Sequence, residues 1–341
     1  MNQFVHLHTH SEYSLLDGAN RLADLIARAR ELEMPALALT DHGTMYGAWQ
    51  FRQQALKAGV RPIVGMEAYV APGDRRSRSL GRGERPYYHL VLLARDLEGY
   101  RNLVRLSSIG FLEGFYHRPR LDREVLARYS GGIIVSSACM AGEVSQHLID
   151  GRTDAAREAA SWYAETFPGR YYLEVQAHDT EGQKDLNEKV LELADAMALP
   201  VVATNDAHFL RPEDHDPHDV LLCIGLGKDR EDANRMKYDG GLYFKTAEEI
   251  AARFPDRPDV LENTLAIADS VSLDLPKQYY VPKFPLPEEF PDEAALLKHL
   301  ALAGAREKFG DPLPAEVSER LEYELGVITN PKADYSGYFL I

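Results

Sequence analysis

The chain has 341 residues, of which 45% are hydrophobic and 27% are charged, and its formal net charge is −15 at pH 7. This composition is typical of a soluble globular protein with a large core, and the acidic balance excludes nucleic-acid binding through a general basic field. No apolar run reaches the length of a membrane span, and two distant cysteines make no disulfide framework, so we expect a cytoplasmic protein without membrane contact.

Seven short apolar segments have the length and residue types of β-strands. They lie at residues 4–8, 36–41, 62–70, 87–94, 132–138, 171–176 and 200–206. Segments with helical periodicity separate most of them, at residues 21–33, 44–59, 97–115, 153–167 and 182–198. Strands that alternate with helices predict a mainly parallel sheet, and this number of strands in about 200 residues favours a barrel.

The pattern changes in the last third of the chain. Thr246 followed by Glu249 is a capping-box pattern, which predicts a helix start. Five prolines between residues 273 and 293 exclude a regular helix or a central strand, so this segment is predicted to be an extended connection. Two amphipathic helices are predicted after it, at residues 292–310 and 315–328. The chain then ends on the apolar sequence SGYFLI, and we expect it to be a fragment of a longer protein.

These patterns divide the chain into three parts. The predicted parts are a barrel domain at residues 1–272, a proline-rich linker at 273–291 and a helical part at 292–341.

Three histidines alternate within the first ten residues, as His6, His8 and His10. Alternate side chains of a strand project from one face, so all three rings could point the same way. The pattern is typical either of a polar strand face or of a metal site.

Residues of metal-ligand type lie at every predicted strand end but one. In α/β barrels functional groups collect at the carboxyl ends of the strands, and imidazole, thiolate and carboxylate are zinc ligands. A single histidine or cysteine is more often an ordinary core or surface residue. Nine matched residues at one end of a barrel favour a metal centre instead. They are His8, His10, Asp17, His42, Glu67, His89, Cys139, Asp206 and His208.

The ordered motifs HLHTH, LLDG, TDHG, GMEAYV, YYHLVLLA, SSAC and TNDAH closely resemble the polymerase and histidinol phosphatase (PHP) domain. More narrowly, VHLHTHSEYSLLDGA, IVGMEAYVAP, NLVRLSS, GFYHRPRLD and ATNDAHF resemble the N-terminal region of the bacterial replicative DNA polymerase III alpha subunits. The resemblance covers essentially the whole chain. It implies an α/β fold, a distorted seven-stranded (β/α)7 TIM-like barrel, with a C-terminal helical extension that begins the polymerase thumb and palm region.

The resemblance also implies a set of three divalent metal ions, zinc in the first instance and manganese or iron as alternatives. One ion would be held by His8, His10, Glu67 and Asp206, with Glu67 bridging to a second ion held by His89 and Cys139. The third ion would be held by Asp17, His42 and His208, and His6 would lie outside the ligand set.

The activity implied by the resemblance is metal-dependent phosphodiester hydrolysis, a 3′–5′ exonuclease step for proofreading in DNA replication. Glu67 and Asp206 would be catalytic through the metals, and Arg118 and Arg120 would bind phosphate, because guanidinium groups bind phosphate in bidentate fashion. The arginine-rich loop at residues 74–86 is a further candidate, although a solvated loop is its ordinary interpretation.

Implied partners are the DNA primer 3′ end, the rest of the polymerase alpha chain, the sliding clamp and a separate proofreading subunit. The nucleotidyltransferase site of the intact polymerase would lie beyond residue 341.

Two alternatives stay open at this point. The first is a small-molecule phosphatase of the histidinol phosphate type, which shares the ligand set. The second is a scaffold that uses metals to stabilise the barrel and docks the polymerase or a proofreading subunit, because metal ligands serve stability as well as chemistry.

Overall fold

The computed structural model describes residues 3–15, 17–79, 85–275 and 282–341. The chain divides into two compact units between Asp274 and Leu275. None of the helices in the described ranges is long and apolar enough to cross a membrane. Each unit is described by itself.

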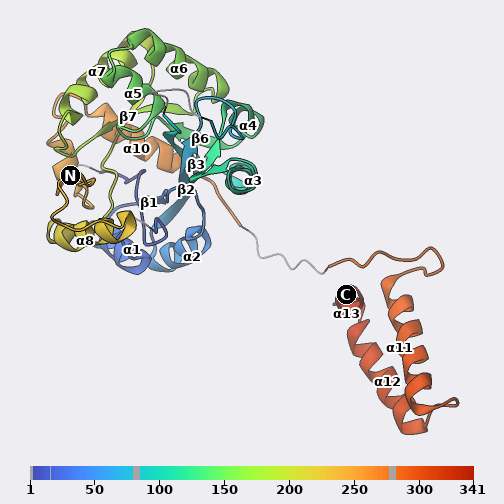
Figure 1. Cartoon of the computed structure of the whole chain (residues 1–341). Coiled ribbons are helices and arrows are strands. Elements are labelled where there is room, and N and C mark those ends of the chain that lie inside the picture. Colours follow the sequence, from blue (N-terminus) through green and yellow to red (C-terminus); the bar gives the residue numbers. More distant parts are fainter. Residues whose placement is uncertain (1–2, 16, 80–84, 276–281) are drawn as a thin grey trace. The chain divides into compact units, whose positions relative to one another are not determined.

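The N-terminal unit is built on a mixed β-sheet that curls into a half-barrel, with helices packed around it (Figure 1). The strand order is β4-β5-β2-β3-β6-β7-β8, and β1 also pairs with β2. The strands are β1 Ala36–Leu39, β2 Arg61–Val70, β3 Tyr88–Ala94, β4 Phe115–Tyr116, β5 Arg118–Leu121, β6 Ile133–Ser136, β7 Tyr171–Gln176 and β8 Val201–Thr204. The helices are α1 Leu22–Glu31, α2 Ala48–Ala58, α3 Leu97–Leu112, α4 Arg123–Arg128, α5 Glu143–Ile149, α6 Thr153–Thr166, α7 Gln183–Met197, α8 His215–Leu226, α9 Ala247–Ala251 and α10 Asp259–Ser270.

The α/β barrel class is confirmed, but the prediction of a mainly parallel sheet is wrong at β3. This strand pairs antiparallel with β2 on one side and with β6 on the other. The described part of the connection between β2 and β3 contains no helix, so the chain returns beside β2 in the opposite direction. The first residues of β3 therefore lie at the end of the barrel where the parallel strands finish.

The predicted strand at residues 4–8 is an irregular extended segment. The backbone N–H of Ala38 in β1 donates to the carbonyl oxygen of His6 (2.9 Å), and the N–H of Ala207 after β8 donates to that of His8 (3.3 Å). The segment therefore lies between β1 and the chain that follows β8.

The interior face of the barrel changes from apolar to polar along its length. Its apolar part includes Val5, Leu7, Ala36, Ala38, Ile63, Val91, Leu93, Ile134 and Val202. On the same strand face, β2 continues to Glu67, β6 to Ser136 and β8 to Thr204, while the reversed β3 presents His89 at its start. The opposite face packs against the surrounding helices in a larger apolar cluster. One end of the barrel is thus a solid core, and the other end offers a ring of polar groups above it.

The C-terminal unit is helical and contains α11 Glu293–Phe309, α12 Ala315–Ile328 and α13 Ser336–Phe339. The side chain of Asp292 caps α11 by accepting from the N–H of Ala295 (2.7 Å). Of the predicted linker, residues 276–281 lie outside the described residues, and residues 282–291 contain neither helix nor strand.

Candidate metal centre

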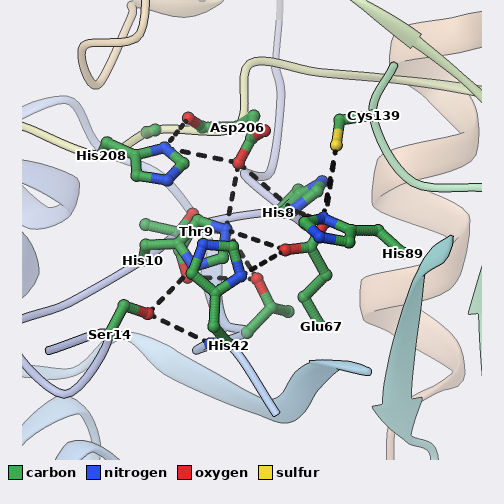
Figure 2. A network of polar contacts seen from close by, with 12 residues as sticks. His8, Thr9, His10, Ser14, His42, Glu67, His89, Cys139, Asp206 and His208 are labelled. Carbon is green, nitrogen blue, oxygen red and sulfur yellow. Dashed lines mark hydrogen bonds and ion pairs between the residues drawn. The ribbon is translucent and has the colours of Figure 1, made fainter. Parts of the chain in front are cut away.

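All nine predicted ligands lie together at the polar end of the barrel interior, and Figure 2 shows eight of them. His8 and His10 come from the N-terminal segment, which bends at His8 and turns both rings toward the centre. The others come from the chain just after β1, β6 and β8, from within β2, from the start of β3 and from the turn before α1. They are His42, Cys139, Asp206, His208, Glu67, His89 and Asp17.

Glu67 is the hub of the centre, and its side chain is only 1% exposed. Its Oε1 lies 3.2 Å from His8 Nε2, 2.9 Å from His89 Nδ1 and 3.7 Å from Cys139 Sγ. Its other oxygen, Oε2, lies 2.6 Å from His42 Nδ1 and 3.7 Å from His10 Nε2. This carboxylate therefore faces donor atoms of five other residues of the cluster.

Asp206 lies on the opposite side of the same rings. Its Oδ1 is 3.0 Å from His10 Nε2, 3.3 Å from His8 Nε2 and 3.5 Å from His208 Nδ1. The residue has a φ of +49°, a conformation that few residues other than glycine adopt. In this conformation the carboxylate faces the rings of His8, His10 and His208. Asp17 completes the set through an Oδ2 that lies 3.2 Å from His42 Nε2.

Seven buried ligand-type atoms of the centre form no hydrogen bond of suitable geometry in the described part of the chain, although five of them lie within 4 Å of a group of opposite charge. Burying polar atoms without well-formed hydrogen bonds costs free energy, so a group of them calls for an explanation. Three triads also place one donor atom per residue within 4.8 Å of each other: His8, His10 and Asp206; His42, Glu67 and His89; His10, His42 and His208. The side chains present therefore fit divalent cations. The unpartnered atoms are His8 Nε2, His10 Nε2, Asp17 Oδ1, His42 Nδ1, Glu67 Oε2, Asp206 Oδ1 and His208 Nε2.

The pKa values of the neighbouring buried histidines His8 and His10 are shifted in opposite directions. Burial favours a neutral His8 ring, but Asp206, Glu174 and Glu67 outweigh it and raise the pKa of His8 well above its usual value. For His10, burial and the neighbouring histidine rings lower the pKa to about 3. Opposite shifts on adjacent rings follow from the different number of carboxylates that each ring faces.

The thiol of Cys139 is held protonated in the metal-free centre. Burial raises its pKa well above the usual value, and the carboxylates of Glu67 and Asp206 raise it further. A coordinated cation has the opposite effect on the thiol pKa, because a thiol that ligates a cation is deprotonated.

A cavity of about 370 Å³ lies over the centre. Six of the nine predicted ligands line it, together with aromatic side chains and one arginine. The lining includes Asp17, His42, His89, Cys139, Asp206, His208, Tyr69, Tyr87, Tyr238 and Arg118. Its volume lies within the range of about 300–1,000 Å³ that is usual for small-ligand pockets.

The two arginines predicted to bind phosphate occupy different environments. Arg118 lines the cavity, with its guanidinium 5.9 Å from the centre of the Tyr69 ring. Arg120 is 2% exposed and donates to the backbone carbonyls of Gly114 (3.2 Å), Arg75 (2.8 Å) and Ser77 (2.6 Å). Arg120, which was predicted to bind phosphate, is therefore covered by the chain around residues 75–77.

One arginine of the arginine-rich loop also forms contacts within the protein. Arg75 is buried and forms ion pairs with Asp122 (3.0 Å) and Glu113 (2.5 Å). Its charge is therefore neutralised within the fold. Arg82, in the same predicted loop, lies outside the described residues.

His6 is separated from the other two N-terminal histidines. Its ring packs between Phe4 and Phe244, at centroid distances of 4.8 and 4.0 Å, and its Nε2 lies 2.9 Å from the carbonyl oxygen of Lys245. The bend at His8 therefore places His6 on the outer face, away from the centre.

Sequence reasoning missed several residues that touch the ligands, among them Ser14, Glu174 and His218. Glu174 is on β7, the strand for which no ligand was predicted, and its Oε1 lies 2.7 Å from His8 Nδ1. A charged residue between apolar neighbours in YYLEVQ was the available signal. His218, on α8, places Nε2 2.7 Å from the carbonyl oxygen of Asp17, and no pattern in the sequence linked this helix to the centre.

The sequence pattern of the PHP domain family matches residues 6–178, a range that contains seven of the nine clustered residues, and the chain belongs to this family. It is also 38% identical over 344 residues to the DNA polymerase III subunit alpha of Borreliella burgdorferi, covering 100% of this chain and 30% of that protein. Identity to the same subunit of Treponema pallidum is 41% over 341 residues, covering 99% of this chain and 29% of that protein. The chain thus spans about 30% of the length of these relatives.

Among solved structures, the chain is similar to a two-domain protein from Bacteroides vulgatus that contains a predicted PHP-like metal-dependent phosphoesterase. The TM-score is 0.40 and the identity 14%, over 80% of this chain and 70% of that one.

Proposed function

We propose that the chain is the N-terminal PHP region of a bacterial, cytoplasmic DNA polymerase III alpha subunit, and that its metal centre hydrolyses phosphodiester bonds at the 3′ end of DNA. The observation that supports this most is the cluster of buried ligand-type atoms without hydrogen bonds of suitable geometry, next to a cavity that six of the nine clustered residues line. The match to alpha subunits over almost the whole chain supports the DNA substrate.

The ligand assignment that we propose uses three divalent ions, zinc with manganese or iron as alternatives. His8, His10, Glu67 and Asp206 would hold the first, Glu67 with His89 and Cys139 would hold the second, and Asp17, His42 and His208 would hold the third. The close triad of His8, His10 and Asp206 agrees with the first group. When bound, such ions supply a deprotonated water and stabilise charge on the attacking and leaving oxygens of a phosphate ester.

The protein's own groups position the substrate. Arg118 is the described arginine of the cavity lining, and it is suited to hold a phosphate oxygen beside the centre. Tyr69 and Tyr87 lie next to His89, at centroid distances of 5.2 and 6.0 Å, and offer ring faces on which a terminal base can stack. A single 3′-terminal nucleotide, rather than a duplex, is the substrate unit that we expect in a cavity of this size.

The polymerase context is part of the same proposal. In it, the rest of the alpha chain supplies DNA synthesis, the helical unit begins the thumb and palm region, and the primer 3′ end, the sliding clamp and a proofreading subunit are the partners.

The test is nucleotide release from a 3′-labelled single strand, measured with zinc, with manganese and with a chelator. Wild type should release single nucleotides with metal and none with chelator. Asp206→Ala should abolish release, whereas His6→Gln, at a buried histidine outside the centre, should retain it. Equal release by the Asp206 variant would refute the proposed site.

A metal-stabilised scaffold is the second candidate, and the arginines favour it. Arg75 and Arg120 are committed to internal contacts, so within the described residues the cavity lining offers the phosphate one arginine, Arg118. A scaffold predicts a large loss of melting temperature on chelation with no nucleotide release under any metal. The exonuclease predicts release as well as stabilisation.

A further inference from the structure

We propose that Glu174 is a positioning residue of the metal centre, which fixes the ring orientation of His8 and keeps its Nε2 free for a cation. The inference rests on the proposed metal centre and adds to it a residue outside the nine ligands. It also gives a role to β7, the barrel strand that provides no ligand.

The carboxylate of Glu174 is completely buried, and four donors surround it. His8 Nδ1 lies 2.7 Å from Oε1, Thr204 Oγ1 donates to Oε1 at 2.6 Å, and Gln176 Nε2 donates to Oε1 at 3.2 Å. Ser136 Oγ donates to Oε2 at 2.5 Å. The four donors come from four different segments of the barrel, so the carboxylate is held from several sides.

These contacts settle which nitrogen of His8 carries a proton toward Glu174. An ionised carboxylate only accepts hydrogen bonds, so Nδ1 must donate. The second nitrogen, Nε2, then faces Glu67 Oε1 (3.2 Å) and Asp206 Oδ1 (3.3 Å), where it has no hydrogen-bond partner. When a cation replaces the proton on Nε2, the ring keeps its Nδ1 proton toward Glu174 and presents the Nε2 lone pair to the space between the two carboxylates.

The surroundings of Glu174 fit a purely structural role less well than a positioning role. Glu174 has one ion-pair partner in the described part of the chain, the His8 ring, and no lysine or arginine compensates its charge there. A buried carboxylate whose one ion-pair partner is a histidine ring is costly, and a neutral glutamine could accept hydrogen bonds at the same position without burying a charge. A carboxylate behind a ligating histidine raises the basicity of the ring and fixes its orientation, and loss of such a partner costs about 10–100-fold in metal affinity.

The test compares Glu174→Gln with wild type in the 341-residue chain. Glutamine keeps the shape and can accept from Nδ1, but it removes the charge, so the fold should be retained. We expect zinc affinity for the ion bound by His8, measured by chelator competition, to fall about 10-fold, and Glu174→Ala to fall further. The matched control is Thr264→Val, because Thr264 is a buried hydroxyl that accepts from the N–H of Val5 and is not part of the centre.

Two further readouts separate positioning from general stability. In zinc-loaded wild type, the Nδ1 proton of His8 should appear downfield by NMR as a hydrogen bond to a carboxylate, and it should move upfield in Glu174→Gln. The melting temperature of the chelated variants reports the structural cost alone. Thr264→Val should lower that temperature with unchanged zinc affinity, whereas Glu174→Gln should lower the affinity.

The outcomes are distinguishable. If wild type binds zinc and Glu174→Gln binds it equally well with an unchanged Nδ1 resonance, the positioning role is refuted and the metal centre stands. If wild type binds no zinc and no manganese, the metal centre and the positioning role fail together.

Discussion

Arg118 and Arg120 provide a matched pair of substitutions, because they are two residues apart on β5 and only one of them lines the cavity. Replacing Arg120 by alanine removes a buried guanidinium and leaves the carbonyls of Gly114, Arg75 and Ser77 without this donor. Hydrogen bonds from charged groups contribute about 1.5–3 kcal/mol each, but the buried charge itself costs free energy. We therefore expect a net loss of about 3 kcal/mol, at the upper end of ordinary single substitutions.

Both tryptophans of the chain, Trp49 and Trp162, belong to the N-terminal unit, so their fluorescence reports the unfolding of the barrel. A loss of about 3 kcal/mol corresponds to about 6–12 °C for a domain of roughly this size. Arg118→Ala should melt within about 2 °C of wild type, because substitutions of incompletely buried arginines change stability by about 0.5 kcal/mol. If Arg120→Ala melts like wild type while Arg118→Ala is strongly destabilised, the structural roles assigned to these arginines are wrong.

Three other substitutions or treatments have defined outcomes. Glu67→Ala should remove more than one ion per chain by elemental analysis, because its carboxylate faces donor atoms assigned to all three ions, whereas His6→Gln should retain the wild-type number. Burial lowers the pKa of His6 from 6.5 to about 4, so the neutral ring is favoured in the folded state. Its contribution to the free energy of unfolding is complete above pH 6.5 and is lost as the pH falls toward 4. In urea unfolding of the metal-free protein, the free energy of unfolding of wild type should therefore fall by about 3 kcal/mol more than that of His6→Gln between pH 7 and 4. Equal losses of unfolding free energy in wild type and His6→Gln would refute the lowered pKa of His6. Chelation should expose Cys139 to alkylation, but burial and two carboxylates raise the pKa of its thiol. The alkylation rate of the chelated protein should therefore stay low at pH 7 and rise only at strongly alkaline pH. Fast alkylation of Cys139 at pH 7 would contradict the raised thiol pKa.

Much of the barrel was predictable from local patterns. The predicted strand at 171–176 coincides with β7, and the predicted helix at 153–167 differs from α6 by one residue at its end. The clustering of ligands was also predictable, because the ends of neighbouring strands meet at one end of a barrel. Periodicity reports which residues are buried, and these elements depend on little else.

Strand direction and side-chain environment were harder to predict from the sequence. The reversal of β3 depends on how the chain returns from β2, and it explains why His89, at the start of a strand, lies among residues at strand ends. Arg120 was predicted to bind phosphate together with Arg118 because both lie in the GFYHRPRLD motif, yet contacts with residues 75–77, more than 40 positions earlier, bury it. Glu174 and His218 became part of the centre only through contacts between distant segments.

The most direct test of the central claim is the metal content of the purified chain after incubation with zinc, manganese or iron and removal of free ions. The nine clustered side chains predict about three divalent ions per wild-type chain, and fewer in Asp206→Ala. A wild-type chain that is folded by tryptophan fluorescence yet retains no divalent ion under any of these conditions would contradict the metal centre.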